Sequence, residues 1–416
     1  MASVLLTSLP AQGHLGPVLA VAAGLAERGH RVRVLTGAGF RGQVEAAGVR
    51  FVELPPEAFV HPEDLDRPIP GGPRGVGVAL EHVFVRRTGP QFAAVQRALA
   101  AEPTDVVVTE LLFMGAYPLL ASTQRPRVVL LGISPLPVRG GGTAPYGLGL
   151  TPARGPLTRA RNALLSAVVD RVLFARPERV LAQEFQRLTG TSLDVSLFDL
   201  PLRTDAVVQL CPPGLEYPRP GLGVPIHFAG PLPVLPRGLP EPPWWADLDA
   251  GRPVVHVTQG TVANTDLRRL VLPALRALAD RPVLVVVSTG GRPVEDVGPV
   301  PANARVSTFL DYARFLPRID ALVTNGGYGT VNLALAHGVP LVVSGRTEDK
   351  AEVGARVAWS GAGIDLRTDR PPPQRLSDAV GRVLTEPGFA RAAGRLRAQI
   401  ETAGGLDTVD RLVRQS

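Results

Sequence analysis

The chain has 416 residues, which is too long for one ordinary hydrophobic core and predicts two domains. Hydrophobic residues make up 45% of it, yet no apolar run approaches the ~20 residues of a membrane span, so we expect a globular protein without one. The formal net charge of +7 could indicate a nucleic-acid partner, but no basic run is interleaved with aromatic residues. We therefore expect no nucleic-acid partner and a mildly cationic surface that attracts small anionic ligands.

The cysteine content and the N-terminus indicate the compartment. The single cysteine, Cys211, excludes an internal disulfide and is typical of a reducing cytoplasm. The chain enters a strand directly, without a basic leader or a cleavage site, so we expect no signal peptide and a cytoplasmic location. Lys350 is the only lysine among 44 basic residues, and with the many Ala, Gly and Pro this is typical of a GC-rich bacterial coding bias.

The N-terminal half alternates short apolar runs with helical patterns. Pro17 and Gly29 bracket the first of these helices, over 17–28. The other helices are expected over 43–47, 81–101 and 157–189, and the strands over 3–7, 31–36, 50–54, 104–109 and 128–131. This alternation predicts an α/β fold with a parallel, doubly wound sheet, whose ligands lie beyond the carboxyl ends of the strands.

Two residues suited to acid–base chemistry follow predicted strands. His14 lies in the loop after the first strand, and Glu110 ends the strand over 104–109. An imidazole can remove a proton from a hydroxyl group because its unperturbed pKa lies near working pH. On their own, His14 could be a polar surface residue and Glu110 an exposed acid. His30 lies in a turn before the second strand, where we expect a structural role.

Two stretches rich in Pro and Gly have no helical or strand period. Residues 55–80 and 134–150 are therefore expected to be surface loops. Proline also crowds residues 216–245, a composition typical of a linker, which divides the chain into a domain over 1–215 and a second over 246–400.

The second half repeats the pattern of the first. Strands are expected over 253–258, 283–288, 305–307, 321–324, 340–343 and 363–366, and closing helices over 376–385, 388–402 and 406–414. After the strand over 321–324 comes the glycine-rich loop 325–330, and then a helix over 331–338. Glycines let a backbone approach a ligand, and a helix N-terminus suits phosphate, although such glycines can serve turn geometry alone.

The stretch 320–350 resembles the donor-binding signature of family-1, nucleotide-sugar-dependent glycosyltransferases. In that family a His-Gly-Gly-x-Gly-Ser/Thr loop grips the diphosphate, a Gly-Val-Pro turn follows, and an Asp-Gln pair holds the sugar. Here Gly338-Val339-Pro340 and the spacings are intact. Asn325 stands in place of the His, Leu333 in place of a Glu that often binds ribose, and Lys350 in place of the Gln.

The resemblance implies the GT-B fold, in which two Rossmann-like domains face each other across a cleft. Phe228-Ala229-Gly230-Pro231 is similar to the motif that ends the first domain in this family. The family's final helix crosses back to that domain, which we carry over to residues 401–416. Loops 55–80 and 134–150 would then choose the acceptor.

The resemblance also implies site residues. Gly13-His14 followed by Pro17 matches the Gly-His-x-x-Pro of the catalytic base, and Glu110 stands where relatives place an Asp that orients it. Phe309 matches the aromatic platform of the nucleobase, although it could equally be a core residue beneath its strand. The implied donor-binding residues are Gly260, Thr261, Ser288, Phe309, Tyr312, Asn325, Gly326, Gly327, Gly329, Thr330, Asp349 and Lys350.

Lys350 is of particular interest because every other basic position holds arginine. We expect its compact ammonium to bind sugar hydroxyls or a diphosphate oxygen, partly replacing the charge lost at Asn325. The alternative is a lysine that survived by chance on a surface loop.

These implications predict an inverting glycosyltransferase. It would move a sugar from a UDP- or dTDP-sugar to a hydroxyl of a small apolar acceptor, such as a polyketide, macrolide or flavonoid. No His/Cys/Asp cluster has metal-ligand spacing, and we expect neither a metal nor a cofactor. The oligomeric state stays open.

Two other classes of function were weighed. A catalytically silent nucleotide-binding protein that assists a partner enzyme is favoured by the departures at Asn325, Leu333 and Lys350, whereas an intact His14 argues against it. An NAD-dependent oxidoreductase needs Gly-x-Gly-x-x-Gly after the first strand, and residues 12–17 fail that test.

Overall fold

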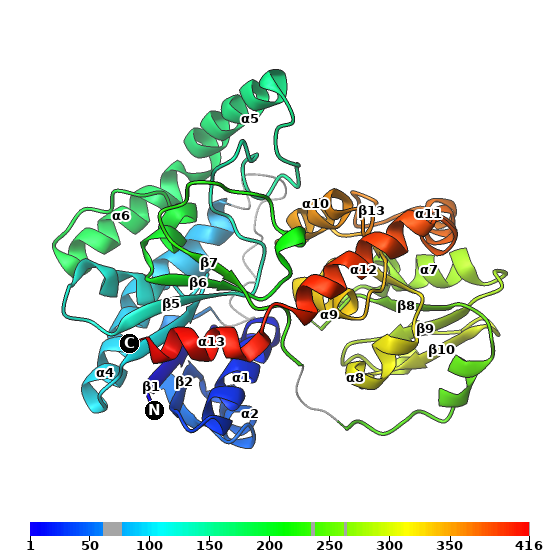
Figure 1. Ribbon diagram of the computed structural model, residues 1–416, viewed down its shortest axis with the longest axis horizontal. Helices are drawn as coiled ribbons and strands as arrows, with labels where there is room; N and C mark the ends of the chain where they lie inside the picture. Colours follow the sequence, from blue (N-terminus) through cyan, green and yellow to red (C-terminus); the bar gives the residue numbers. More distant parts are fainter. Residues whose placement is uncertain (61–76, 234–237, 262–263, 416) are drawn as a thin grey trace.

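The computed structural model describes residues 1–60, 77–233, 238–261 and 264–415, and it contains two sheets, one in each half of the chain (Figure 1). The first has the strand order β3-β2-β1-β4-β5-β6-β7 and the second the order β10-β9-β8-β11-β12-β13. Neighbouring strands are parallel in both sheets. Each sheet therefore has the Rossmann order, with its first and fourth strands adjacent at the topological switch point where ligands bind.

The strands are short and apolar, as expected for sheets covered on both faces. In the first sheet they are β1 Ser3–Thr7, β2 Arg31–Gly37, β3 Arg50–Leu54, β4 Val106–Glu110, β5 Arg127–Gly132, β6 Ala206–Gln209 and β7 Ile226–Phe228. In the second sheet they are β8 Val254–Thr258, β9 Leu284–Ser288, β10 Ala304–Ser307, β11 Ala321–Thr324, β12 Leu341–Val343 and β13 Gly363–Asp365.

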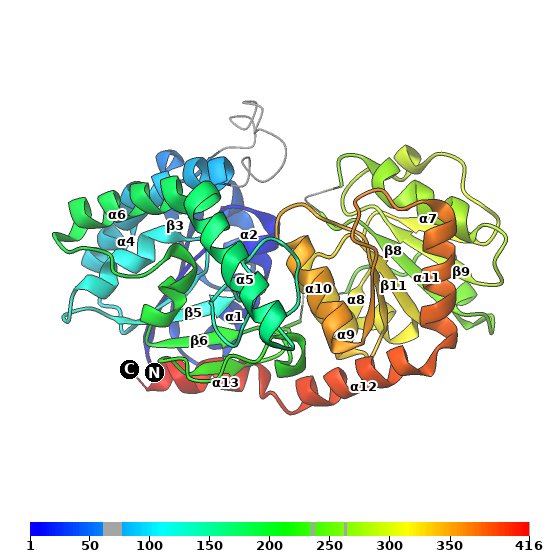
Figure 2. The same ribbon diagram turned by 90° about the horizontal axis from the view of Figure 1, so that it is seen from above.

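Helices flank both sheets (Figures 1 and 2). In the first half they are α1 Gln12–Glu27, α2 Arg41–Ala46, α4 Thr88–Ala101, α5 Pro156–Val169 and α6 Ala175–Thr189. In the second half they are α7 Val271–Leu278, α8 Tyr312–Phe315, α9 Tyr328–Ala336, α10 Lys350–Ser360, α11 Pro373–Thr385, α12 Pro387–Glu401 and α13 Gly405–Arg414.

Alternation along β1 shows how the core of the first domain is built. Val4 and Leu6 face the layer that contains α1 and α13, whereas Leu5 faces the layer that contains α4. Successive side chains of a strand point to opposite faces, so one five-residue apolar strand supplies both cores. The buried strand fixes where its carboxyl end lies, and the residues that follow it reach the edge where ligands bind.

Two sequence predictions about this half are corrected by the structure. Helix α1 begins at Gln12 rather than at Pro17, so His14 lies in its first turn and not in a loop. Pro17 only removes the hydrogen bond that its own N–H would make to Gly13, near the helix end, while Leu15, Val18 and Leu19 continue one buried face. Residues 216–245, expected to be linker, contain β7, which pairs with the unpredicted strand β6.

The last helix returns to the first domain. α13 lies against α1, and its Val409, Leu412 and Val413 belong to the first domain's core (Figure 2). His30 has a structural role there: its Nδ1 accepts from the Ala2 N–H, and its Nε2 lies 2.6 Å from Asp410 Oδ1.

Candidate active site

A histidine–carboxylate pair lies where β1 and β4 end. His14 Nδ1 is 3.0 Å from Oε1 of Glu110, the last residue of β4. The buried Glu110 carboxylate also accepts from the Leu112 N–H at 2.8 Å and from the Leu9 N–H at 3.3 Å. Because an ionised carboxylate can only accept, His14 carries its proton on Nδ1 and leaves Nε2 as the basic nitrogen.

The charges around this pair favour a protonated imidazole. Burial lowers the pKa of His14, but the charge and hydrogen bond of Glu110, with further contributions from Asp349 and Glu348, raise it above the ordinary value of 6.5. Asp349 and Glu348 come from the second half of the chain, so charges of the other domain, including that of the predicted sugar-binding residue Asp349, act on His14. The side chain of His14 remains 28% exposed, which leaves the ring accessible to a substrate.

The predicted diphosphate loop joins β11 to α9. Gly327 caps α9, and Gly326 adopts the left-handed backbone, with φ 94°, where a Cβ would lie 2.9 Å from Val343. Asn325 is only 8% exposed, and its Nδ2 donates to the Gln259 carbonyl at 2.6 Å. Its Oδ1 has no hydrogen-bond partner among the residues that the structure describes. A buried acceptor in this state is unusual and marks a place where a ligand's donor or a water is expected.

Lys350 is a buried residue and not part of a surface loop, so the alternative of a chance surface lysine is wrong. Its side chain is 5% exposed, and its ammonium pairs with Glu348. It lines a small cavity together with Asn325, Gln259, Arg269, Leu270, Ser344, Thr347 and Asp369. The sequence placed Asn325 and Lys350 in one site, and this cavity brings them together.

The remaining residues predicted to bind the donor differ in their exposure to solvent. Phe309 is 54% exposed, so the alternative of a core residue is wrong. Its ring lies over Gly291, where an added Cβ would approach Phe309 Cζ to 3.3 Å. Gly329 and Thr261 are also exposed, and Thr330 is half-buried. An exposed ring beyond the end of β10 can stack on a flat base.

Ser288 and Tyr312 instead belong to a buried polar cluster around His256 of β8. The Tyr312 hydroxyl lies 3.0 Å from His256 Nε2, and the Ser288 hydroxyl donates to Thr258 at 3.0 Å. Burial lowers the pKa of His256 to about 4, so this imidazole is neutral. We infer that Ser288 and Tyr312 support the strand ends from within.

Two groups near the His14–Glu110 pair were not predicted from the sequence. Glu348, whose charge acts on His14, has a left-handed backbone with φ 56°, a conformation that side chains other than glycine rarely adopt. Tyr146, in loop 134–150, has a pKa raised well above 10.0 by burial and then by the charges of Asp349 and Glu352. No sequence motif marks either residue, because each acts through neighbours far away along the chain.

Comparisons with known proteins agree with this arrangement. Residues 4–95 match the glycosyltransferase family 28 N-terminal domain, and residues 271–405 match the erythromycin biosynthesis protein CIII-like C-terminal domain. The chain is 41% identical over 422 residues to 4'-demethylrebeccamycin synthase of Lentzea aerocolonigenes, with 98% of each protein covered. This chain belongs to the family-1, nucleotide-sugar-dependent glycosyltransferases. It is an enzyme, a glycosyltransferase of the natural-product type.

Further relatives extend the comparison. UDP-glucosyltransferase A1 of Starmerella bombicola is 33% identical, over 99% of this chain and 92% of that protein. The solved structure of the calicheamicin glycosyltransferase CalG4 superposes with a TM-score of 0.72 at 23% identity, covering 100% of this chain and 98% of that one. The glycosyltransferase SsfS6 of Streptomyces sp. SF2575, complexed with thymidine diphosphate, has a TM-score of 0.69 at 19% identity and covers both chains fully. The expected GT-B fold is thereby confirmed.

The described residues contain neither a membrane-spanning helix nor a cluster of metal ligands. None of their helices is both long and apolar enough to cross a membrane. In the same part of the chain, no three His, Cys, Asp or Glu side chains gather as ligands for a metal ion.

Proposed function

We propose that this glycosyltransferase inverts the anomeric centre of a UDP- or dTDP-sugar and transfers the sugar to a hydroxyl of a small apolar acceptor. The observation that carries the proposal is the His14–Glu110 pair, with a 3.0 Å contact at Nδ1, an accessible ring and two donor-side carboxylates as neighbours. A paired base that faces the sugar-binding residues is what direct displacement requires.

In this mechanism His14 Nε2 takes the proton of the acceptor hydroxyl. The oxygen attacks the anomeric carbon on the face opposite the diphosphate, and the bond from that carbon to the diphosphate breaks. Glu110 keeps the ring oriented and stabilises its charged form, so its role is positional. Three elements hold the leaving diphosphate: the first-turn N–H groups of α9, the hydroxyl of Thr330 and the ammonium of Lys350. We propose that they do so without a resident metal or cofactor.

The donor would lie across the ends of the second sheet. Its base stacks on Phe309, its diphosphate lies at Gly326–Thr330, and its sugar reaches Asp349. Relatives named for UDP-sugars and a fold neighbour complexed with thymidine diphosphate support a pyrimidine nucleotide of either kind. We propose an apolar acceptor because the rings of Tyr146 and Phe198 lie 5.7 Å apart, and the charge of Asp349 acts on Tyr146 as well as on His14.

A thermal-shift panel of nucleoside diphosphates and their sugars tests the donor. A ligand at 100 times its Kd should add about 2.7 kcal/mol to the free energy of unfolding. Transfer is then measured with the donor that binds, and the anomeric configuration of the product is read by NMR, where inversion is expected. Chelators should leave the rate unchanged. No shift with any nucleotide, retention of configuration, or a rate lost to chelators and restored by magnesium would each contradict a part of the proposal.

A further inference from the structure

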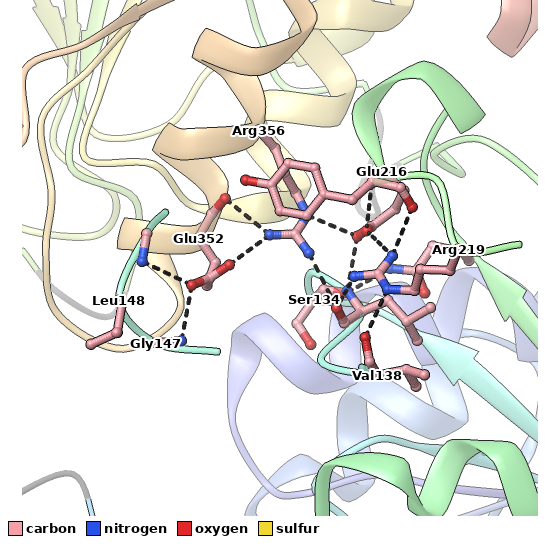
Figure 3. A network of polar contacts seen from close by, with 12 residues as sticks. Ser134, Val138, Gly147, Leu148, Glu216, Arg219, Glu352 and Arg356 are labelled. Atoms are coloured by element: carbon pink, nitrogen blue, oxygen red, sulfur yellow. Dashed lines mark hydrogen bonds and ion pairs between the residues drawn. The ribbon is translucent and has the colours of Figure 1, made fainter. Parts of the chain in front are cut away.

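A buried ionic network joins helix α10 to the loop 134–150 of the other domain (Figure 3). Its centre is Arg356, 1% exposed at the side chain, which contacts Glu352 Oε2 at 2.8 Å and Glu216 Oε1 at 3.1 Å. Burial lowers the pKa of Arg356, but the two carboxylates outweigh burial and raise it. The guanidinium also lies 4.3 Å from the centroid of the Tyr217 ring.

The network holds the backbone of the loop at two points. At the first, the Glu216 carboxylate accepts from the Leu136 N–H at 2.8 Å, and the Leu136 carbonyl accepts from Arg356 at 3.1 Å. At the second, Glu352 Oε1 accepts from the N–H groups of Gly147 and Gly149, each at 2.9 Å. Gly149 has φ 61°, and a Cβ there would lie 2.6 Å from the Ala351 carbonyl, so the close approach requires glycine.

Between these two points the loop carries Tyr146. Its ring lies 5.7 Å from Phe198 of the first domain, and Asp349 acts on its hydroxyl as it acts on His14. Tyr146 and His14 therefore share Asp349 as a neighbouring charge. The first two turns of helix α10 thus contribute to both sites. Asp349 and Lys350 begin the helix at the proposed donor site, and Glu352 and Arg356 hold the loop.

We propose that Glu216, Glu352 and Arg356, here called the loop clamp, are positioning residues that set the acceptor pocket. Through α10, the donor-binding domain would hold the loop 134–150 at a fixed position relative to the donor sugar. The proposal rests on the proposed function for the identity of the pocket. It goes beyond it by assigning acceptor selection to Glu352 and Arg356 of the donor domain, together with Glu216 of the segment between the domains.

The test measures both loop protection and steady-state kinetics. Glu352→Ala removes all three contacts of the carboxylate, whereas Glu352→Gln keeps an oxygen for the two glycine N–H groups but no charge for Arg356. We expect faster amide exchange of the peptide over 143–150 in Glu352→Ala, and an acceptor KM raised ~10-fold or more, with donor Kd and kcat at saturating acceptor close to wild type. Glu352→Gln should lie between the two.

Glu386→Gln is the matched control, because Glu386 caps the C-terminus of α11 and pairs with Arg382 at i,i+4 spacing, and both side chains are exposed. It should change neither measurement. Gly149→Ala disrupts the same contact from the loop side and should also raise the acceptor KM. It therefore tests the proposal even if Glu352→Ala does not fold.

The proposal would be overturned by an active enzyme whose Glu352 variants keep the wild-type acceptor KM. It would also fall if donor Kd rose as much as acceptor KM, since Glu352 would then act on the sugar-binding end of α10. If the wild type transferred no sugar at all, the proposed function would fail, while the exchange experiment would still decide whether the clamp holds the loop.

Discussion

The two sheets share one strand order, yet the edges that they present to the cleft are in different states. On the first sheet, the proposed base is held in place: His14 is bonded to Glu110, and Glu110 is bonded to two backbone N–H groups. On the second sheet, Asn325 Oδ1 has no partner among the described residues, and the ring of Phe309 is exposed. One edge carries a polar pair that is hydrogen-bonded within the protein, and the other carries a buried acceptor and an exposed ring.

This difference separates the residues proposed for the chemical step from those proposed for donor binding. A base must be oriented in advance, because its contribution depends on geometry at the moment of reaction. Groups that bind a donor can take their partners from it: Asn325 Oδ1 is an acceptor and suits a hydroxyl of the sugar, and the Phe309 ring suits the base. Substitutions on the two edges should therefore have different kinetic consequences.

The largest effect is expected for His14→Ala. General-base assistance contributes ~10²–10⁴-fold, so transfer should fall by that range when chemistry limits the rate. Single-turnover kinetics with saturating donor and acceptor measures it. A variant that kept more than about a third of the wild-type rate would show that His14 is not the base.

Phe309→Ala should have the next largest effect, on the opposite edge. Stacking of a base on an aromatic ring contributes ~1–3 kcal/mol, which corresponds to a donor Kd raised roughly 5- to 150-fold. Calorimetric titration measures the Kd, and Phe309→Tyr is the matched control that keeps a ring. Equal Kd values for Phe309→Ala and wild type would place the base elsewhere.

The pH profile tests how Glu110 acts. Because the pKa of His14 is raised above 6.5, the neutral base is lost as pH falls through that raised value, and kcat/KM should fall with it. Glu110→Gln removes the charge that opposes burial, so the acidic limb should move to lower pH while the plateau drops less than for His14→Ala. Glu110→Asp should recover most of the profile. An unmoved acidic limb in Glu110→Gln would assign that limb to another group.

Lys350→Arg should show the smallest effect, a donor Kd raised several-fold. A guanidinium is wider than an ammonium, and the Lys350 side chain is only 5% exposed in a small cavity. As the chain has no other lysine, an amine-selective reagent can modify only Lys350 and the N-terminus. The labelling of Lys350 should be slower with donor bound than without it. The same labelling rate with and without a bound donor would remove Lys350 from the site.

Local patterns were enough to predict most of the fold. The short apolar strands and the glycine turns carry their own signals, and the second sheet was predicted strand by strand to within a residue or two. The N-terminus of α1 was misplaced because Pro17 is an ambiguous signal, tolerated here within the helix. The strand β6 was missed because Ala206–Gln209 lies between Pro201 and the proline-rich stretch that begins at Pro212.

The site was predictable only where residues lie within a motif. His14 and Glu110 end predicted strands, and Asn325 and Lys350 belong to one signature. The clamp could not be predicted, since Arg356 and Glu216 are 140 residues apart and their pairing depends on how the domains meet. Only the i,i+4 spacing of Glu352 and Arg356 hinted at an ion pair, and that spacing says nothing of burial.

The most direct test of the separation between the two edges is a crossed measurement of donor Kd and single-turnover rate. His14→Ala and Asn325→Asp are compared with wild type, Asn325→Asp being a near-isosteric change that places a negative charge beside the diphosphate. We predict that His14→Ala keeps donor Kd within about twofold while the rate at saturating donor collapses. Asn325→Asp should raise donor Kd at least tenfold, because a carboxylate at this position repels the diphosphate, and keep most of the rate once donor saturates. Parallel losses of binding and rate in both variants would contradict the account.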